Sequence, residues 1–206
     1  MDRRTRRATW GATTAERSAV LPGDELLSQP ADQTTRAITI DAPAPVVWPW
    51  LVQIGADRAG FYSYDWLENL VGLHIHSADR IVDRWQHLEV GDLVYGDRRR
   101  HGGWVVVLLA PAEALVLQVA DVARRRPVRR DEGVGWEFQW TFALVPVDER
   151  TTRLLVRERV AFGRRLTRWL MTPAGLVSFV MTRRMMFGIA ERAERSAATT
   201  ETDRAA

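Results

Sequence analysis

The feature that most limits the possible folds of this chain is the alternation of apolar and polar side chains in two neighbouring segments. Residues 136–144 read WEFQWTFAL, and residues 152–162 read TRLLVRERVAF. In both segments large apolar side chains recur at every second position, which is typical of a strand with one buried face. We therefore predict antiparallel strands over 135–147 and 152–162, joined by a short polar turn.

The inner face of this hairpin is expected to be aromatic. One face of the first strand carries Trp136, Phe138, Trp140, Phe142 and Leu144, and one face of the second carries Leu154, Val156, Glu158, Val160 and Phe162. Because apolar faces point toward the core, Glu158 is predicted at an inward position. A charged carboxylate there would be desolvated unless it is paired.

Two interpretations of Glu158 stay open at this point. It is either an acid/base group or ligand anchor in a cavity, or a structural residue paired with a neighbouring arginine. A bulge would instead shift the register by one residue and turn Arg157 and Arg159 inward. Those two guanidinium groups would then bind an anionic ligand head or pair with Asp65 or Glu68.

The other periodic segments supply partners for this hairpin. An amphipathic helix is expected over 173–195, and its second half carries a buried stripe of Met185, Met186, Ile189 and Ala193. A single terminal helix can cover one face of an antiparallel sheet. The remaining expected elements are strands over 35–40, 93–96, 104–110 and 115–122, short helices over 46–54 and 66–71, and a structured loop over 73–90.

The chain length of 206 residues suits one domain with tails. We expect a partly ordered N-terminal arm over 1–34, the domain itself over 35–196, and a disordered tail over 197–206. No apolar segment follows the arginines of the first seven residues, so no export signal is complete. This predicts a cytoplasmic protein.

Composition excludes several kinds of chemistry. All 29 basic residues are arginine, and there is no lysine and no cysteine. These absences rule out a Schiff-base lysine, a thiol nucleophile, a disulfide framework and a thiolate metal site. Any catalysis must therefore come from carboxylates, tyrosine, histidine, arginine or bound water, and we expect no cofactor.

The charge pattern favours a small molecule over nucleic acid as the partner. The net charge is only +3, although loops over 98–100 and 124–130 are rich in arginine. No aromatic-interleaved RNA motif accompanies these loops, so we expect them to be solvated or to contact anionic lipid. The apolar run Trp169–Met181 is too short to span a bilayer. It is predicted to be covered by the arm, a second subunit of an oligomer, or a membrane surface in a peripheral contact.

Four stretches of the sequence carry a resemblance to a known group of proteins. They are AITIDAPAPVVWPWLVQIG (37–55), GFYSYDWLENLVGLHIHSADRI (60–81), WQHLEVGD (85–92) and TRRMMFGIAERAE (182–194). These segments resemble those of the SRPBCC, or START-like helix-grip, superfamily, and the resemblance covers residues 35–196. Within the superfamily they are most similar to an uncharacterised actinobacterial branch. Members include lipid-transfer domains, pollen-allergen-like proteins and polyketide cyclase/dehydrase-type proteins.

The resemblance implies both a fold and a cavity. The fold would be α+β helix-grip: a curved antiparallel β-sheet wrapped around a long C-terminal α-helix, with two short helices after the first strand. A deep apolar cavity between sheet and helix would bind or carry a hydrophobic small molecule, such as a lipid or a polyketide. An alternative is a cyclase/dehydrase-type enzyme, and a second alternative is a peripheral membrane protein.

Candidate residues follow from these hypotheses. For catalysis they are Glu158, His74 and His76; the motif H-x-H-x-x-D that ends at Asp79 has metal-ligand spacing. Because no third or fourth ligand is identifiable, ordinary loop hydrogen bonding is the more common outcome, and no metal is expected. The residues expected to contact a ligand are Tyr62, Tyr64, Trp66, Trp85, Trp104, Trp136, Phe138, Trp140, Glu158, Met185 and Met186.

Overall fold

The computed structural model describes residues 7–70, 75–132, 135–163 and 174–205. The strands are β1 (Asp32–Ile40), β2 (Leu93–Tyr95), β3 (Gly103–Ala110), β4 (Ala114–Asp121), β5 (Arg126–Pro127), β6 (Trp136–Pro146) and β7 (Thr152–Phe162). The helices are α2 (Thr14–Ser18), α3 (Ala44–Val52), α4 (Asp65–Leu70) and α6 (Ala174–Ala205), with 3-10 turns η1 (Asp24–Leu27) and η2 (Asp83–Trp85).

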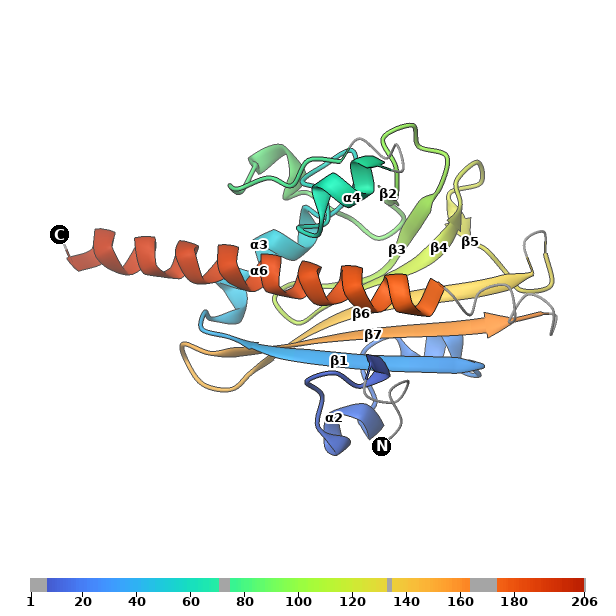
Figure 1. Ribbon diagram of the computed structural model, residues 1–206, viewed down its shortest axis with the longest axis horizontal. Coiled ribbons are helices and arrows are strands. Elements are labelled where there is room, and N and C mark those ends of the chain that lie inside the picture. Colours follow the sequence, from blue (N-terminus) through green and yellow to red (C-terminus); the bar gives the residue numbers. More distant parts are fainter. Residues whose placement is uncertain (1–6, 71–74, 133–134, 164–173, 206) are drawn as a thin grey trace.

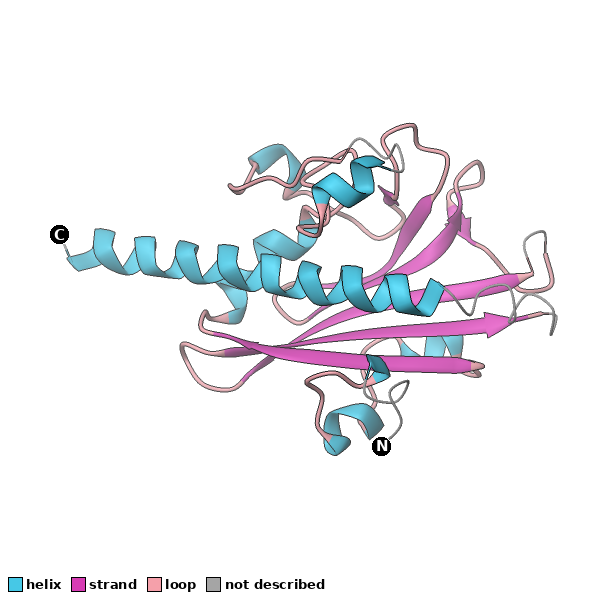
Figure 2. Cartoon of the chain, in the orientation of Figure 1, coloured by secondary structure: helices cyan, strands magenta, loops and turns pink. Residues whose placement is uncertain are grey.

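All seven strands belong to one antiparallel sheet. Its order is β1-β7-β6-β4-β3-β2, and β5 pairs with β4 beside this path. Helix α6 lies across one face of the curved sheet, with α3 and α4 beside it (Figures 1 and 2). The predicted fold class, an α+β helix-grip architecture with two short helices after the first strand, is therefore confirmed.

The hairpin that the alternation predicted forms the centre of the sheet. Strands β6 and β7 pair without interruption from Trp136 opposite Phe162 to Pro146 opposite Thr152. Strand β1 then pairs with β7 and begins at Asp32, three residues before the expected start. The sequence of 32–34 is polar and shows no alternation that would have placed it in a strand. Pairing with β7 extends β1 over these residues.

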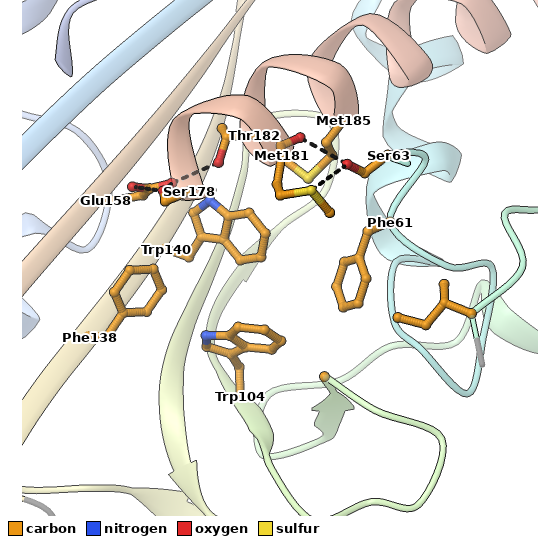
Figure 3. A pocket seen from close by; sticks show the side chains of 12 residues that line it. Phe61, Ser63, Trp104, Phe138, Trp140, Glu158, Ser178, Met181, Thr182 and Met185 are labelled. Atoms are coloured by element: carbon orange, nitrogen blue, oxygen red, sulfur yellow. Dashed lines mark hydrogen bonds between the residues drawn. The ribbon is translucent and has the colours of Figure 1, made fainter. Parts of the chain in front are cut away.

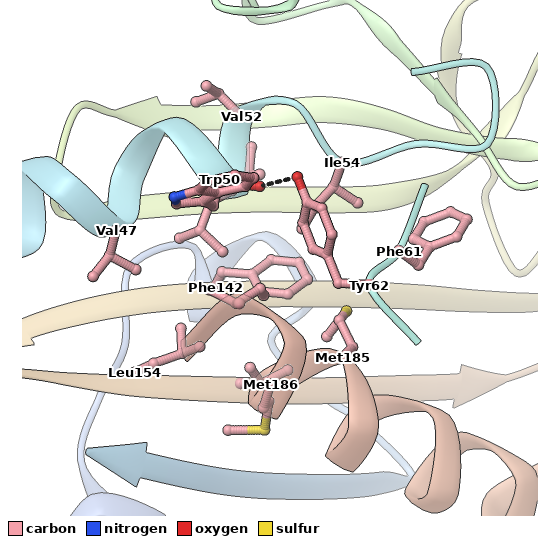
Figure 4. Packing of buried hydrophobic residues seen from close by; sticks show 14 of the residues in the cluster. Val47, Trp50, Val52, Ile54, Phe61, Tyr62, Phe142, Leu154, Met185 and Met186 are labelled. Carbon is pink, nitrogen blue, oxygen red and sulfur yellow. Dashed lines mark hydrogen bonds between the residues drawn. The ribbon is translucent and has the colours of Figure 1, made fainter. Parts of the chain in front are cut away.

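The core lies between the inner face of the sheet and the helices. Figure 4 shows Trp50 of α3, Phe142 of β6 and Met186 of α6 packed in one cluster. The whole predicted stripe of α6, namely Met185, Met186, Ile189 and Ala193, is buried. Burying this stripe against the sheet is what fixes the helix in place.

Helix α6 is longer than the sequence pattern indicated. It runs to Ala205 instead of ending near Arg195, so most of the tail that was expected to be disordered is helical. This segment is rich in alanine and contains neither glycine nor proline, so nothing in it stops a helix. The hydroxyl groups of Thr199, Thr200 and Thr202 also donate hydrogen bonds to carbonyl groups four residues earlier.

The N-terminal arm is ordered over its described residues and crosses the free edge of β1. The carbonyl of Trp10 accepts a hydrogen bond from the amide of Ala37, and Leu21 packs with Leu155 on the outer face of the sheet. The indole of Trp10 reaches round to α6, where its ring centroid lies 5.5 Å from that of Phe187. The arm thus covers the side of the sheet opposite to α6.

Candidate functional site

A cavity of about 290 Å³ lies between the inner face of the sheet and α6. Figure 3 shows the side chains of β3, β6, α6 and the segment before α4 converging on it. Its lining residues are Phe61, Ser63, Ile75, Gly96, Trp104, Phe138, Trp140, Glu158, Ser178, Met181, Thr182 and Met185.

One side of the cavity is a continuous aromatic wall. Phe138 and Trp140 are alternate residues of β6, so both point inward, and Trp104 reaches the same space from β3. The ring centroids of Trp104 and Trp140 are 5.4 Å apart, and those of Phe61 and Trp104 are 6.0 Å apart. Aromatic walls of this kind bind flat or apolar molecules by burying their surface.

The segment that brings Phe61 and Ser63 to the cavity is anchored by Tyr62. The hydroxyl group of Tyr62 donates to the carbonyl of Trp50 at 3.1 Å and accepts from the Gln53 side chain at 2.9 Å. Burial raises the pKa of Tyr62, so the phenol is neutral. Tyr62 is therefore a core residue that positions its two neighbours, and it does not line the cavity.

Next to the aromatic wall, the described lining of the cavity contains one carboxylate, Glu158 of β7. The Ser178 hydroxyl donates to it at 2.7 and 2.8 Å, and the Thr182 hydroxyl donates at 2.8 Å. The Thr34 hydroxyl also donates, at 3.3 Å. Arg36 Nη1 lies 2.9 Å from Glu158 Oε1, close enough for an ion pair. The negative charge of Glu158 is thus compensated by a cation and by hydroxyl groups.

This arrangement decides between the interpretations of Glu158. The register of β7 has no bulge, so Glu158 lies on the inner face and is paired with an arginine, Arg36 of β1. Arg157 and Arg159 lie on the outer face, where both form ion pairs with Asp24 at 2.5 and 2.6 Å. The alternative in which these two arginines face the cavity or pair with α4 is therefore wrong.

Trp140 carries a buried donor without an acceptor. It is the direct cross-strand partner of Glu158, so the two side chains stand next to each other on the inner face. Its indole Nε1 is buried and has no hydrogen-bond partner in the described part of the chain. Figure 3 shows the nitrogen edge of the ring turned toward α6.

Of the expected ligand-contact residues, Trp104, Phe138, Trp140, Glu158 and Met185 line the cavity. Trp136 lines a second groove of about 370 Å³ that shares Gly96, Trp104 and Phe138 with the cavity. Met186 is core, and the Trp66 side chain is 68% exposed. Tyr64, which directly precedes α4, and Trp85 of η2 are not among the described residues that line the cavity.

Only part of the histidine motif lies among the described residues. His74 lies outside the described residues, and His76 is exposed. Asp79 forms an ion pair with Arg192 of α6 at 2.8 Å. Among the described residues no group of three or more histidines and acidic residues could hold a metal ion.

Sequence reasoning missed the residues that complete the polar side of the cavity. Ser178 and Thr182 are four residues apart on α6 and so share one helix face. Two hydroxyl groups on the buried face of an apolar helix were the available signal. Arg36 was missed because its pairing with Glu158 depends on the register of β1 against β7.

The arginine-rich loops carry less free charge than their composition suggests. Arg124 pairs with Asp121, and Arg126 pairs with Glu132. Arg130 pairs with Glu137 in the same way. Of the apolar run Trp169–Met181, residues 169–173 lie outside the described part of the chain. No helix in the described part of the chain is both long and apolar enough to cross a membrane.

Comparisons with known proteins give structural likeness only. No protein-family model and no curated protein sequence matches the chain. Protein NE0264 from Nitrosomonas europaea has a TM-score of 0.47 at 13% identity, with 82% of this chain and 99% of that chain covered. Norcoclaurine synthase from Thalictrum flavum has a TM-score of 0.45 at 15% identity, with 78% and 84% covered. Likeness at this level says nothing about ligand or reaction, so the function proposed below depends on the residues of this chain alone.

Proposed function

We propose that this protein binds a small, largely apolar molecule in the cavity between the sheet and α6. The observation that carries the proposal is the lining itself: three aromatic rings of the sheet face Met181 and Met185 across about 290 Å³. This volume is at the lower end of the range of about 300–1,000 Å³ that is common for small-molecule sites. Aromatic and thioether side chains adapt well to an apolar ligand.

Titration with the neutral fluorescent probe N-phenylnaphthylamine tests this proposal. We expect saturable binding with one site in the full chain. Met181→Trp fills the cavity and should weaken binding at least about tenfold, or about 1.4 kcal/mol. Val180→Trp is the matched control, because it adds the same side chain at an exposed position of the same helix. Unchanged binding in Met181→Trp would count against the cavity as the site.

Native mass spectrometry of protein purified from its own host is the complementary experiment. A hydrophobic molecule that co-purifies with the wild-type chain and is depleted in Met181→Trp would identify the natural ligand. Repeated empty spectra, together with no probe binding, would argue against the proposed function.

Acid/base catalysis of the cyclase or dehydrase type is a second candidate, favoured by the presence of Glu158 in the cavity wall. The contacts of Glu158 weigh against it, because Arg36 and three hydroxyl groups all stabilise the anion that a proton transfer would have to discharge. If turnover of a bound molecule is found, Glu158→Gln should abolish it. Retained turnover in that variant would remove Glu158 from the mechanism.

The four sequence segments 37–55, 60–81, 85–92 and 182–194 support an assignment to a family. We propose on their basis that the chain is an SRPBCC protein of an actinobacterial branch. The fold is consistent with this assignment but is shared by many proteins of unrelated function.

A further inference from the structure

Three side chains around Glu158 have hydrogen-bonding capacity that no other described residue uses. Trp140, Ser178 and Thr182 all line the cavity, and we call them the polar corner. We propose that the polar corner binds the hydroxyl group of a neutral alcohol or phenol. This inference rests on the proposed function and specifies the class of ligand.

The hydroxyl groups of Ser178 and Thr182 in the polar corner can accept hydrogen bonds from a ligand. A hydroxyl has one proton to donate and two lone pairs, whereas an ionised carboxylate can only accept. Since Glu158 is paired with Arg36, the protons of Ser178 and Thr182 are directed to its oxygens at 2.7–2.8 Å. No described residue donates to either hydroxyl oxygen, so their lone pairs can accept from a donor on the ligand.

The indole N–H of Trp140 in the polar corner can donate a hydrogen bond to a ligand. An indole N–H can only donate. The Trp140 side chain is more than nine-tenths buried, and Nε1 has no acceptor among the described residues. A buried donor without a partner is unfavourable, so an acceptor atom of a ligand placed next to Trp140 Nε1 would form a favourable hydrogen bond.

A hydroxyl group is the simplest group that satisfies both requirements. It accepts from Trp140 Nε1 and donates to Ser178 or Thr182, whereas a carbonyl only accepts and an ammonium only donates. A carboxylate would bring a negative charge beside Glu158, and none of the described lining residues is a cation. The rest of the ligand is apolar, because Trp104 and Phe138 enclose it.

Matched naphthalene probes test this inference on the full chain. Naphthol and methylnaphthalene carry substituents of similar size, and only the first can form hydrogen bonds. Isothermal titration, or displacement of N-phenylnaphthylamine, should show naphthol binding about tenfold more tightly than methylnaphthalene. Naphthoate should bind more weakly than naphthol, because its charge finds no partner.

Two variants of the polar corner should remove this preference. Trp140→Phe removes the donor, and Thr182→Val removes a hydroxyl at nearly constant volume. In both we expect the naphthol advantage to fall to within about twofold while methylnaphthalene binding is retained. Trp50→Phe is the matched control, since Trp50 Nε1 is also buried with no hydrogen-bond partner among the described residues, and Trp50 does not line the cavity.

A spectroscopic readout separates hydrogen bonding from general loss of packing. The indole ¹H–¹⁵N signal of Trp140, assigned by its absence in Trp140→Phe, should shift on adding naphthol but much less on adding methylnaphthalene. If both probes bind equally and the indole signal responds equally, the inference is wrong while the proposed function stands. If neither probe binds, both are wrong.

Discussion

At the scale of single residues, the ion pair between Arg36 and Glu158 places a charge inside an apolar site. The side chains of Arg36 and Glu158 are 2% and 9% exposed. Removing two charges from water is costly, and their mutual attraction and the surrounding hydroxyl groups offset much of this cost. Each charge therefore depends on the other for its place in the fold.

Removal of one partner should be far worse than removal of both. Arg36→Met leaves a buried carboxylate without a cation and should lower the free energy of unfolding by about 3–5 kcal/mol. The double variant Arg36→Met with Glu158→Gln should recover much of that loss. Urea unfolding measures both effects as shifts of the midpoint at constant slope. A double variant no more stable than Arg36→Met alone would contradict the pairing.

At the scale of elements, the approach of α6 to the segment that carries Tyr62 depends on Gly188. A Cβ atom at position 188 would lie 2.7 Å from Tyr62 Cβ, which is closer than two carbon atoms can pack. One turn further on, Arg192 covers the face of the Tyr62 ring, with its guanidinium carbon 4.9 Å from the ring centroid. Because Phe61 and Ser63 flank Tyr62, the packing of α6 against Tyr62 also positions these two residues at the cavity.

Gly188→Ala should therefore destabilise the protein, although alanine favours a helix over glycine by about 1 kcal/mol. We expect a net loss of about 1–3 kcal/mol from overpacking, measured by urea unfolding, together with weaker binding of N-phenylnaphthylamine. Thr199→Ala, at an exposed position of the same helix, is the control and should change stability little. A Gly188→Ala variant more stable than wild type would show that the helix does not need this close approach.

The elements themselves were largely predictable, because each depends on local periodicity. The alternation in β6 and β7 indicated the inner face of the sheet, and the methionine stripe of α6 is buried as predicted. The prediction of a single buried face was incomplete, because the outer face around Gln139, Thr141 and Arg157 is buried as well. The polar side of the cavity was only partly predictable. Glu158 could be placed inward from its own strand, but Arg36 and Ser178 reach it from two other elements, β1 and α6. Such contacts depend on strand order and register, which no local pattern encodes.

At the scale of the whole molecule, the N-terminal arm acts as a second cover for the sheet. Asp24 pairs with both Arg157 and Arg159, and Arg157 also donates to the carbonyl groups of Glu16 and Arg17 in α2. Burial lowers the pKa of Arg157, and the charge of Asp24 opposes this shift. The arm is therefore attached mainly through polar contacts, whereas α6 is attached mainly through its buried apolar stripe.

Asp24→Asn should loosen the arm and leave the cavity side in place. Without the carboxylate, two largely buried guanidinium groups lose their counter-charge, and we expect stability to fall by about 3 kcal/mol. Hydrogen exchange followed by mass spectrometry should show lost protection over residues 14–27 and little change in α6. Glu25→Gln, at the exposed neighbouring position, is the matched control. Wild-type protection of the arm in Asp24→Asn would contradict this view of its attachment.

The arm should also loosen at acidic pH through Glu16. The side chain of Arg153 donates to both carboxylate oxygens of Glu16, at 2.6 and 3.1 Å. Mainly because of this contact, and against the opposing effect of burial, the pKa of Glu16 falls from 4.5 to about 2. A carboxyl group whose pKa is lower in the folded state stabilises the fold above its unfolded pKa and loses that contribution as pH falls.

The stability difference between wild type and Glu16→Gln measures this contribution directly. It should be constant above the unfolded pKa of 4.5 and should shrink as pH falls from there toward about 2, where Glu16 becomes protonated in both states. Urea unfolding at a series of pH values, with Glu25→Gln as the control for loss of an exposed carboxylate, gives the two curves. A difference that stays constant down to the lowest pH, or that grows as pH falls, would mean that the Glu16–Arg153 contact does not hold the arm on the sheet.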